Sequence, residues 1–139
     1  MNTGRGRWSI IVAISLALSL ALAACSAGVP SPSAAPGTGL TITAVAGPAC
    51  PVERIPPDPA CAPRPVAGAT VVVQDGQNKS VTTVVLDAHG AAIVALPVGD
   101  YVVQPQRVTG LLGTAQTANV TVVDGTLTPV VLSYDTGIR

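Results

Sequence analysis

Short runs of β-forming residues recur along the chain from residue 40 onward, separated by Gly, Pro, Asn and Asp. In several runs apolar and polar side chains alternate, which is typical of a strand with one buried face. The runs predict seven strands, at residues 41–45, 69–74, 81–86, 91–96, 101–104, 118–123 and 126–133. Seven short strands with turn signals at this spacing predict an all-β sandwich.

The same alternation predicts which side chains face the core. The inward set comprises Ala69, Val71, Val73, Ala92, Val94, Leu96, Tyr101, Val103, Val120 and Val122. Thr70, Gln74, Gln104 and Thr121 are expected to face outward. Pro129 has no backbone N–H to donate, so the last strand is predicted to lie at a sheet edge or to be bulged there.

The segment before these strands has the pattern of an export signal. Arg5 and Arg7 precede an uncharged, mostly apolar run over residues 8–24. The run ends in Leu22-Ala23-Ala24-Cys25, which resembles the lipobox of bacterial lipoproteins. The resemblance implies cleavage before Cys25 and a diacylglyceryl thioether on its sulfur. An uncleaved transmembrane helix stays open as the alternative, although the run is at the short end of a spanning length.

These segments define the domain organisation. Residues 1–24 are interpreted as a signal peptide, residues 25–39 as a Ser/Pro/Ala/Gly tether, and residues 40–139 as the sandwich domain. The predicted location is the extracytoplasmic face of the cell membrane, where the lipid on Cys25 would anchor the domain. Without the leader, five basic side chains remain against seven acidic ones, a net charge of −2. A nucleic-acid partner would require a clustered basic face, so none is expected.

The other two cysteines, Cys50 and Cys61, form an even pair in a chain predicted to be exported. A disulfide is the expected state in that compartment. Closing a loop of this length contributes about 3 kcal/mol in the chain-entropy model. A zinc site is not expected because His89 is the only histidine and no Cys-x-x-Cys occurs. We therefore predict no metal and no other cofactor.

Three motifs along the chain carry a resemblance to a known family. They are Val66-Ala67-Gly68-Ala69-Thr70-Val71, Asp87-Ala88-His89-Gly90 and Leu96-Pro97-Val98-Gly99-Asp100-Tyr101. Together they resemble the carboxypeptidase regulatory-like domain over about residues 41–134. The resemblance implies a transthyretin-like, immunoglobulin-like Greek-key sandwich of seven strands, and a non-catalytic accessory or adhesive role. One departure is Ala92, where the family usually has Phe after the turn.

Two features have the form of catalytic residues. Asp135-Thr136-Gly137 matches the tripeptide of aspartic proteases, but that chemistry needs two carboxylates sharing a proton. A turn is the favoured interpretation, in which Asp135 could pair with a buried or partly buried arginine that the sequence does not identify. His89 lies in a predicted turn, and no nucleophile elbow of the Gly-x-Ser-x-Gly kind occurs. The sequence therefore nominates no catalytic residue.

The predicted function is a lipid-anchored, non-enzymatic envelope module. It would meet an envelope protein or a cell-wall polymer through loops or a free strand edge. The alternative is a lipoprotein that binds a carbohydrate or a small solute. Sugar sites rely on aromatic side chains, and the only Phe, Tyr or Trp residues in the predicted domain are Tyr101 and Tyr134. Tyr134 is the residue to test for that alternative.

Overall fold

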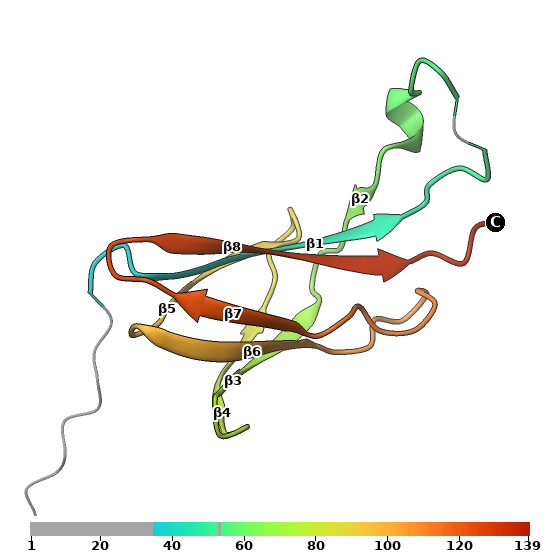
Figure 1. The fold of residues 1–139 in the computed structure, drawn as a ribbon. Coiled ribbons are helices and arrows are strands. Elements are labelled where there is room, and N and C mark those ends of the chain that lie inside the picture. Colours follow the sequence, from blue (N-terminus) through green and yellow to red (C-terminus); the bar gives the residue numbers. More distant parts are fainter. Residues whose placement is uncertain (1–34, 53) are drawn as a thin grey trace, which may run out of the picture. The chain divides into compact units, whose positions relative to one another are not determined.

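A computed structural model of the chain describes residues 35–52 and 54–139 (Figure 1). The predicted leader and Cys25 lie outside the described residues. No helix within the described residues has the length and apolar character needed to cross a bilayer. The described strands are β1 (Gly39–Gly47), β2 (Arg64–Pro65), β3 (Thr70–Asp75), β4 (Ser80–Val85), β5 (Ala91–Ala95), β6 (Gly99–Pro105), β7 (Ala118–Val122) and β8 (Leu127–Asp135). A 3₁₀ turn, η1 (Pro59–Cys61), lies between β1 and β2.

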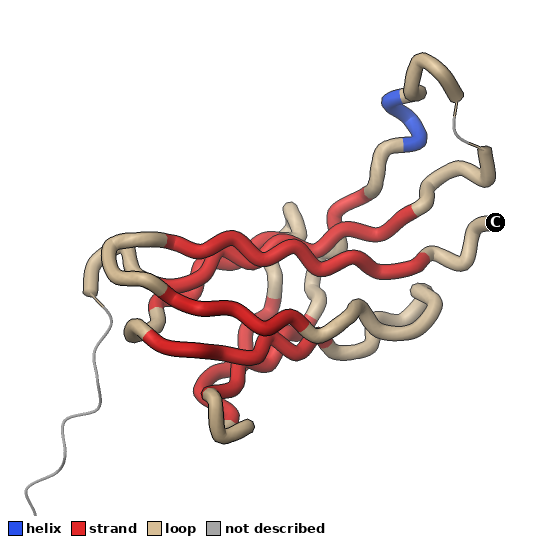
Figure 2. The backbone as a smooth tube through the Cα atoms, viewed as in Figure 1, coloured by secondary structure: helices blue, strands red, loops and turns tan. Residues whose placement is uncertain are grey.

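The strands form two four-stranded sheets, which confirms the predicted all-β sandwich (Figure 2). In the first sheet, β1 is central: β2 and β5 pair antiparallel along one side of it, and β8 pairs parallel along the other. The second sheet has the order β4-β3-β6-β7, antiparallel throughout. All seven predicted strands are present. The additional strand, β2, has only two residues and includes a proline, so it carries no periodic signal.

The core lies between the two sheets and contains the side chains that alternation predicted. Of the inward set, Ala92 and Val120 are half-buried against the core, and the others are buried. Gln104 and Thr121 are exposed, as expected, whereas Thr70 and Gln74 are half-buried. The core also includes Leu40, Ile42, Leu132 and Tyr134, from the parallel pair β1–β8. Small aliphatic side chains therefore supply most of the buried apolar surface that stabilises the sandwich.

The position of Pro129 follows from the pairing of β8. Gly39 N donates to Thr126 O, and Thr136 N donates to Gly47 O, so the even-numbered residues of this segment face β1. The odd-numbered residues, Pro129 among them, point their backbone groups toward the free edge. A proline there removes no hydrogen bond from the ladder. The prediction that Pro129 lies at a sheet edge is confirmed.

The turn between β4 and β5 shows why its sequence requires Asp and Gly. Asp87 Oδ1 accepts from the backbone N–H groups of His89 at 2.8 Å and Ala91 at 2.9 Å. Both hydrogen bonds lower the pKa of Asp87, and the bond from Ala91 has the larger effect. Gly90 adopts a φ of +68°, and a Cβ at that position would lie 2.7 Å from Ala44 O. The turn therefore needs a residue without a side chain, both for its dihedral angle and for the close approach of β1.

Candidate binding surface

The described chain enters the sandwich at one pole. Thr38 is buried, and its hydroxyl donates to Asp124 Oδ1 at 3.2 Å and accepts from Gly125 N at 2.8 Å. These bonds fasten the start of β1 to the turn between β7 and β8; we name this end the N-terminal pole. From there β1 and β8 run parallel for nine residues each, a length of about 30 Å. Both strands end at the opposite end, named here the C-terminal pole (Figure 1).

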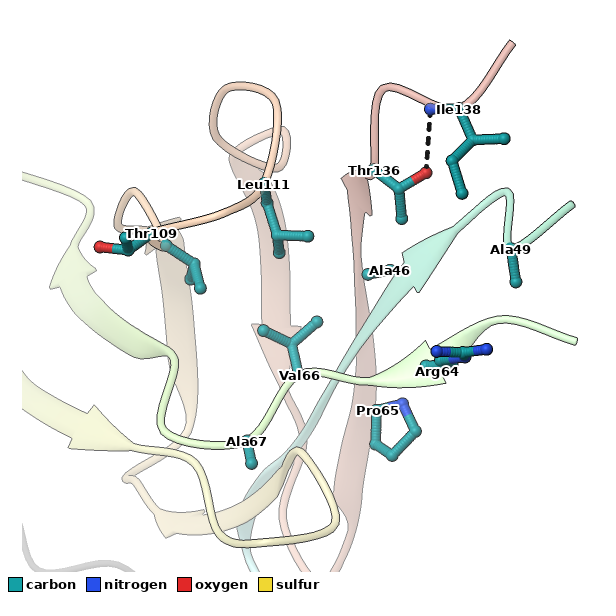
Figure 3. A pocket seen from close by; sticks show the side chains of 11 residues that line it. Ala46, Ala49, Arg64, Pro65, Val66, Ala67, Thr109, Leu111, Thr136 and Ile138 are labelled. Atoms are coloured by element: carbon teal, nitrogen blue, oxygen red, sulfur yellow. Dashed lines mark hydrogen bonds between the residues drawn. The ribbon is translucent and has the colours of Figure 1, made fainter. Parts of the chain in front are cut away.

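An open groove of about 490 Å³ lies at the C-terminal pole (Figure 3). Its wall combines the end of β1, the segment around β2, the loop between β6 and β7, and the tail after β8. The apolar lining residues are Ala46, Ala49, Pro65, Val66, Ala67, Val108, Leu111 and Ile138. A concave, mostly apolar surface with few polar groups is the usual form of a binding site.

Hydrogen bonds from the tail hold one wall of the groove in place. Thr136 N donates to Gly47 O at 3.2 Å, and its hydroxyl donates to Pro48 O at 2.6 Å. Ile138 N in turn donates to the Thr136 hydroxyl at 3.3 Å, the bond drawn in Figure 3. The tail therefore continues along β1 beyond the end of β8, and it places Ile138 at the rim.

Among the described residues, Arg64 is the ionisable side chain that lines the groove. No acidic residue of the described part of the chain lines it, so the guanidinium is the charge that this lining offers to a ligand. Among the described residues the ion pair is that of Arg139 with Asp135, whose Nη2 and Oδ2 lie 2.7 Å apart. The arrangement suits a largely apolar ligand that carries a hydrogen-bond acceptor or an anionic group near Arg64.

A disulfide between Cys50 and Cys61 confirms the pairing predicted from the sequence. It closes an arm, described over residues 48–52 and 54–63, that extends past the ends of β1 and β2 at the C-terminal pole (Figure 1). Asp58 accepts from Ala60 N at 2.9 Å and so starts the 3₁₀ turn within the arm. Ile55 is fully exposed, and Val52 is 69% exposed. The arm thus presents apolar side chains to solvent next to the groove.

Asp135, which the sequence placed in a protease-like tripeptide, takes part in a turn. Its Oδ1 accepts from Gly137 N at 2.7 Å, and both carboxylate oxygens contact Arg139. The hydrogen bond from Arg139, followed by that from Gly137, lowers the pKa of Asp135 to about 2. The arginine partner is therefore Arg139, and the expectation that it is buried or partly buried is wrong, because the Arg139 side chain is exposed. Within the described residues the hydrogen-bond partners of this carboxylate are Gly137 and Arg139 and not a second carboxylate, which the protease pair requires.

Neither of the remaining candidates, His89 and Tyr134, lines the groove. His89 is exposed in the turn after β4. The described residues contain no group of three or more His, Cys, Asp or Glu side chains arranged for a metal ion. Tyr134 is only 2% exposed, and its hydroxyl donates to Gln106 O at 2.9 Å. Tyr134 therefore cannot stack on a sugar, and its suggested role as a carbohydrate contact is wrong.

Sequence reasoning missed the groove itself. Its residues come from segments far apart in the chain, such as Ala46, Val66 and Leu111, and most are ordinary apolar residues. No spacing rule joins them, because their proximity depends on how the two sheets meet. Arg64 is the one member whose charge in an otherwise apolar stretch could have drawn notice.

No protein-family model matches the chain, and no curated protein matches it. Several solved structures have the same fold. The minor pilin GBS52 of Streptococcus agalactiae is 16% identical over 71% of this chain and 44% of its own, with a TM-score of 0.55. The shaft pilin SpaA of Lactobacillus rhamnosus GG is 11% identical over 71% and 51%, with a TM-score of 0.55. The Bacillus anthracis TIE protein is 17% identical over 71% and 17%, with a TM-score of 0.52.

The chain thus spans about half, or less, of the length of these structures. At such low identities the likeness establishes the fold: a β-sandwich of the kind found in domains of Gram-positive surface pilins.

Proposed function

We propose that this chain is a lipid-anchored, non-enzymatic module of the cell envelope that binds a protein or cell-wall partner at its C-terminal pole. The observation that carries the proposal is the polarity of the sandwich. The chain enters at the N-terminal pole, whereas the groove and the disulfide-closed arm both lie at the other end of β1. A module anchored through its N-terminus would therefore present its binding surface away from the membrane.

Three further observations support the proposal. The predicted leader and the Leu22-Ala23-Ala24-Cys25 sequence resemble those of lipoproteins, which would make Cys25 the anchor. The three motifs of the sandwich resemble the carboxypeptidase regulatory-like family, whose members are accessory modules. The structural neighbours include two pilins, proteins of bacterial surfaces whose sandwich domains share this fold.

The anchor is tested by metabolic labelling with an alkyne palmitate analogue in bacteria that produce the full chain. We expect label on the wild type and none on a Cys25→Ser variant, because the thioether forms on that sulfur. A wild-type chain that stays unlabelled would exclude the lipid anchor, while leaving the binding surface to be tested separately.

The binding surface is tested by cosedimentation of the chain with purified cell-wall sacculi and, separately, by its retention on immobilised envelope proteins. We expect saturable binding to one of the two, weakened about tenfold by Ile138→Glu, which puts a charge worth over 1.4 kcal/mol of desolvation into the groove. Val123→Glu is the matched control, since Val123 is 56% exposed and lies beside the turn at the N-terminal pole. If the chain binds neither preparation, or if both variants lose binding equally, the proposal is contradicted.

A second function, binding of a small solute, is favoured by one observation: the groove volume of about 490 Å³ falls in the range of small-molecule sites. Arg64 would then hold an anionic group of an otherwise apolar solute. A thermal-shift screen of apolar carboxylates and phosphates tests this, with Arg64→Ala as the variant that loses the shift. If no compound raises the melting temperature of the wild type, the groove is not a solute site.

A further inference from the structure

The two sheets end in edge strands, and most of these edges carry a feature that hinders pairing with another chain. On β8, Pro129 removes one donor, and Asp135 O already accepts from Leu112 N at 2.7 Å. On β7, Thr121 O accepts from the hydroxyl of Thr128 at 3.2 Å. On β5, Ala91 N donates to Asp87, and Ala91 O accepts from Asp87 N at 2.9 Å. Natural sheets commonly protect their edges with such devices.

The edge of β4 carries no such device: the outer backbone groups of its regular part all lack a partner within the described chain, whereas β5 and β8 combine unpartnered groups with the protected residues named above. Leu86 N donates to Ala69 O, and Val84 lies opposite Val71, so the even-numbered residues of this segment pair with β3. The backbone N–H and C=O of Thr83 and Val85 consequently point to the free edge. This leaves two donors and two acceptors exposed on one strand, a template for a further strand.

The side chains along this edge are also those that favour strand pairing. Residues 80–85 contain no charge and no proline, and five of the six are Val or Thr. Val85 is 64% exposed, and Thr83 is exposed as well. A register shift between Val73 and Gln74 ends the regular pairing before Val81, so the usable edge is short. This edge has room for one outward-facing residue on each side of Val84, namely Thr83 and Val85.

We propose that two copies of this chain pair through β4, antiparallel about a two-fold axis at Val84, and so join their β4-β3-β6-β7 sheets into one continuous sheet. In this register Thr83 of each copy lies opposite Val85 of the other. Each such pair exchanges both of its backbone hydrogen bonds, as residues in a hydrogen-bonded antiparallel pair do. All free donors and acceptors on both edges are then satisfied.

The charges at the two ends of β4 explain why the strand that pairs is a second copy. Lys79 precedes the strand, and Asp87 follows it. An antiparallel arrangement brings Lys79 of each copy beside the turn that carries Asp87 of the other, within reach of a long side chain. Lys79 makes no ion pair within the described chain, and Asp87 uses only Oδ1 in its own turn. The interface is therefore self-complementary in both hydrogen bonding and charge.

Cysteine cross-linking of the full chain in whole bacterial cells that produce it tests this register, whether or not the chain is anchored to the membrane. At the two-fold axis the Val84 Cα atoms form a non-hydrogen-bonded pair about 4.5 Å apart, within the range of a disulfide. The side chain of Thr82 also faces inward. The Thr82 Cα atoms of the two copies would lie about 14 Å apart, because they are four residues apart along the paired strands. We expect Val84→Cys to give a covalent dimer on a non-reducing gel at about ten times the yield of Thr82→Cys or the wild type.

A second set of variants separates pairing from folding. Added to Val84→Cys, Thr83→Pro removes the central donor from the free edge without touching the bonds to β3, whereas Thr83→Ala keeps that donor. We expect the proline to reduce cross-linking about tenfold and the alanine to leave it unchanged, with the Cys50–Cys61 disulfide intact in both by mass spectrometry. Equal cross-linking at Val84 and Thr82, no cross-linking at Val84, or equal yields with proline and alanine would each overturn the proposal.

Discussion

The glycine of the turn after β4 allows a sharp test of how this sandwich is held together. Gly90 and Gly125 have nearly the same backbone conformation, with φ of +68° and +67°. They differ in their surroundings: a Cβ at Gly90 would lie 2.7 Å from Ala44 O and 2.8 Å from Val66 N, and one at Gly125 would meet nothing within 4 Å. Substitution by alanine at each position therefore separates dihedral strain from the close approach of backbones.

The expected magnitudes follow from these surroundings. The left-handed conformation costs an alanine about 1–2 kcal/mol, and the stiffer unfolded chain returns about 0.4–1 kcal/mol. Gly125→Ala should thus cost about 1 kcal/mol. Gly90→Ala must in addition displace two hydrogen bonds, from Ala44 N to Gly90 O at 2.8 Å and from Val66 N to Ala44 O at 3.0 Å. At about 1 kcal/mol each, these raise the total to about 3 kcal/mol.

Equilibrium unfolding in urea, followed by circular dichroism, measures the difference. With an m-value of about 1.5 kcal/mol per molar, the midpoint of Gly90→Ala should lie about 1.3 M below that of Gly125→Ala. If the urea midpoints of the two variants lie within about 0.3 M of each other, dihedral strain alone accounts for the destabilisation by Gly90→Ala. The close approach of this turn to β1 then adds nothing to that destabilisation.

Three further outcomes follow from the described contacts. Tyr134→Phe should lower the free energy of unfolding by about 1 kcal/mol, because it leaves the partly buried carbonyl of Gln106 without its donor; no change would mean that water replaces the hydroxyl. The folded pKa of Asp135, about 2, is below its unfolded value of 3.8, so the stability from its pairing with Arg139 is present above pH 4 and is lost as the pH falls through 2. In an NMR titration Arg139→Gln should raise that pKa toward 3.8, and an unchanged midpoint would show that Gly137 alone holds it. Replacing both cysteines of the Cys50–Cys61 disulfide by serine should cost at most about 3 kcal/mol in unfolding free energy, since the exposed arm also becomes free in the folded state; a larger loss in urea unfolding would show that the arm packs on the sandwich.

The strands were predictable because most are amphipathic and bounded by strong turn residues. Val71, Val73 and Val103 alternate with polar or outward positions, and all three are fully buried. The disulfide was predictable because two cysteines allow only one pairing. The parallel pairing of β1 with β8 was not predicted, because local patterns describe a strand's faces but not its neighbours.

Tyr134 shows where sequence reasoning about a site failed. An aromatic residue near the C-terminal end of the chain fits a surface contact as well as a core position, and alternation in the predicted last strand did not extend to it. The structure buries it between the sheets and gives its hydroxyl to Gln106 O. The groove residues Ala46, Val66 and Leu111 carried no signal for a related reason: each is an ordinary apolar residue on its own.

The order of residues by itself determined the strand content, the faces of most strands, the turn at Asp87 and the pairing of Cys50 with Cys61. These depend on interactions between residues near in sequence, or on a choice with only one solution. The tertiary structure alone decided that β1 and β8 lie side by side, that a groove opens at the C-terminal pole, and that the backbone of Thr83 remains without a partner. Such features arise where distant segments meet, and their geometry depends on how two sheets pack rather than on any local pattern.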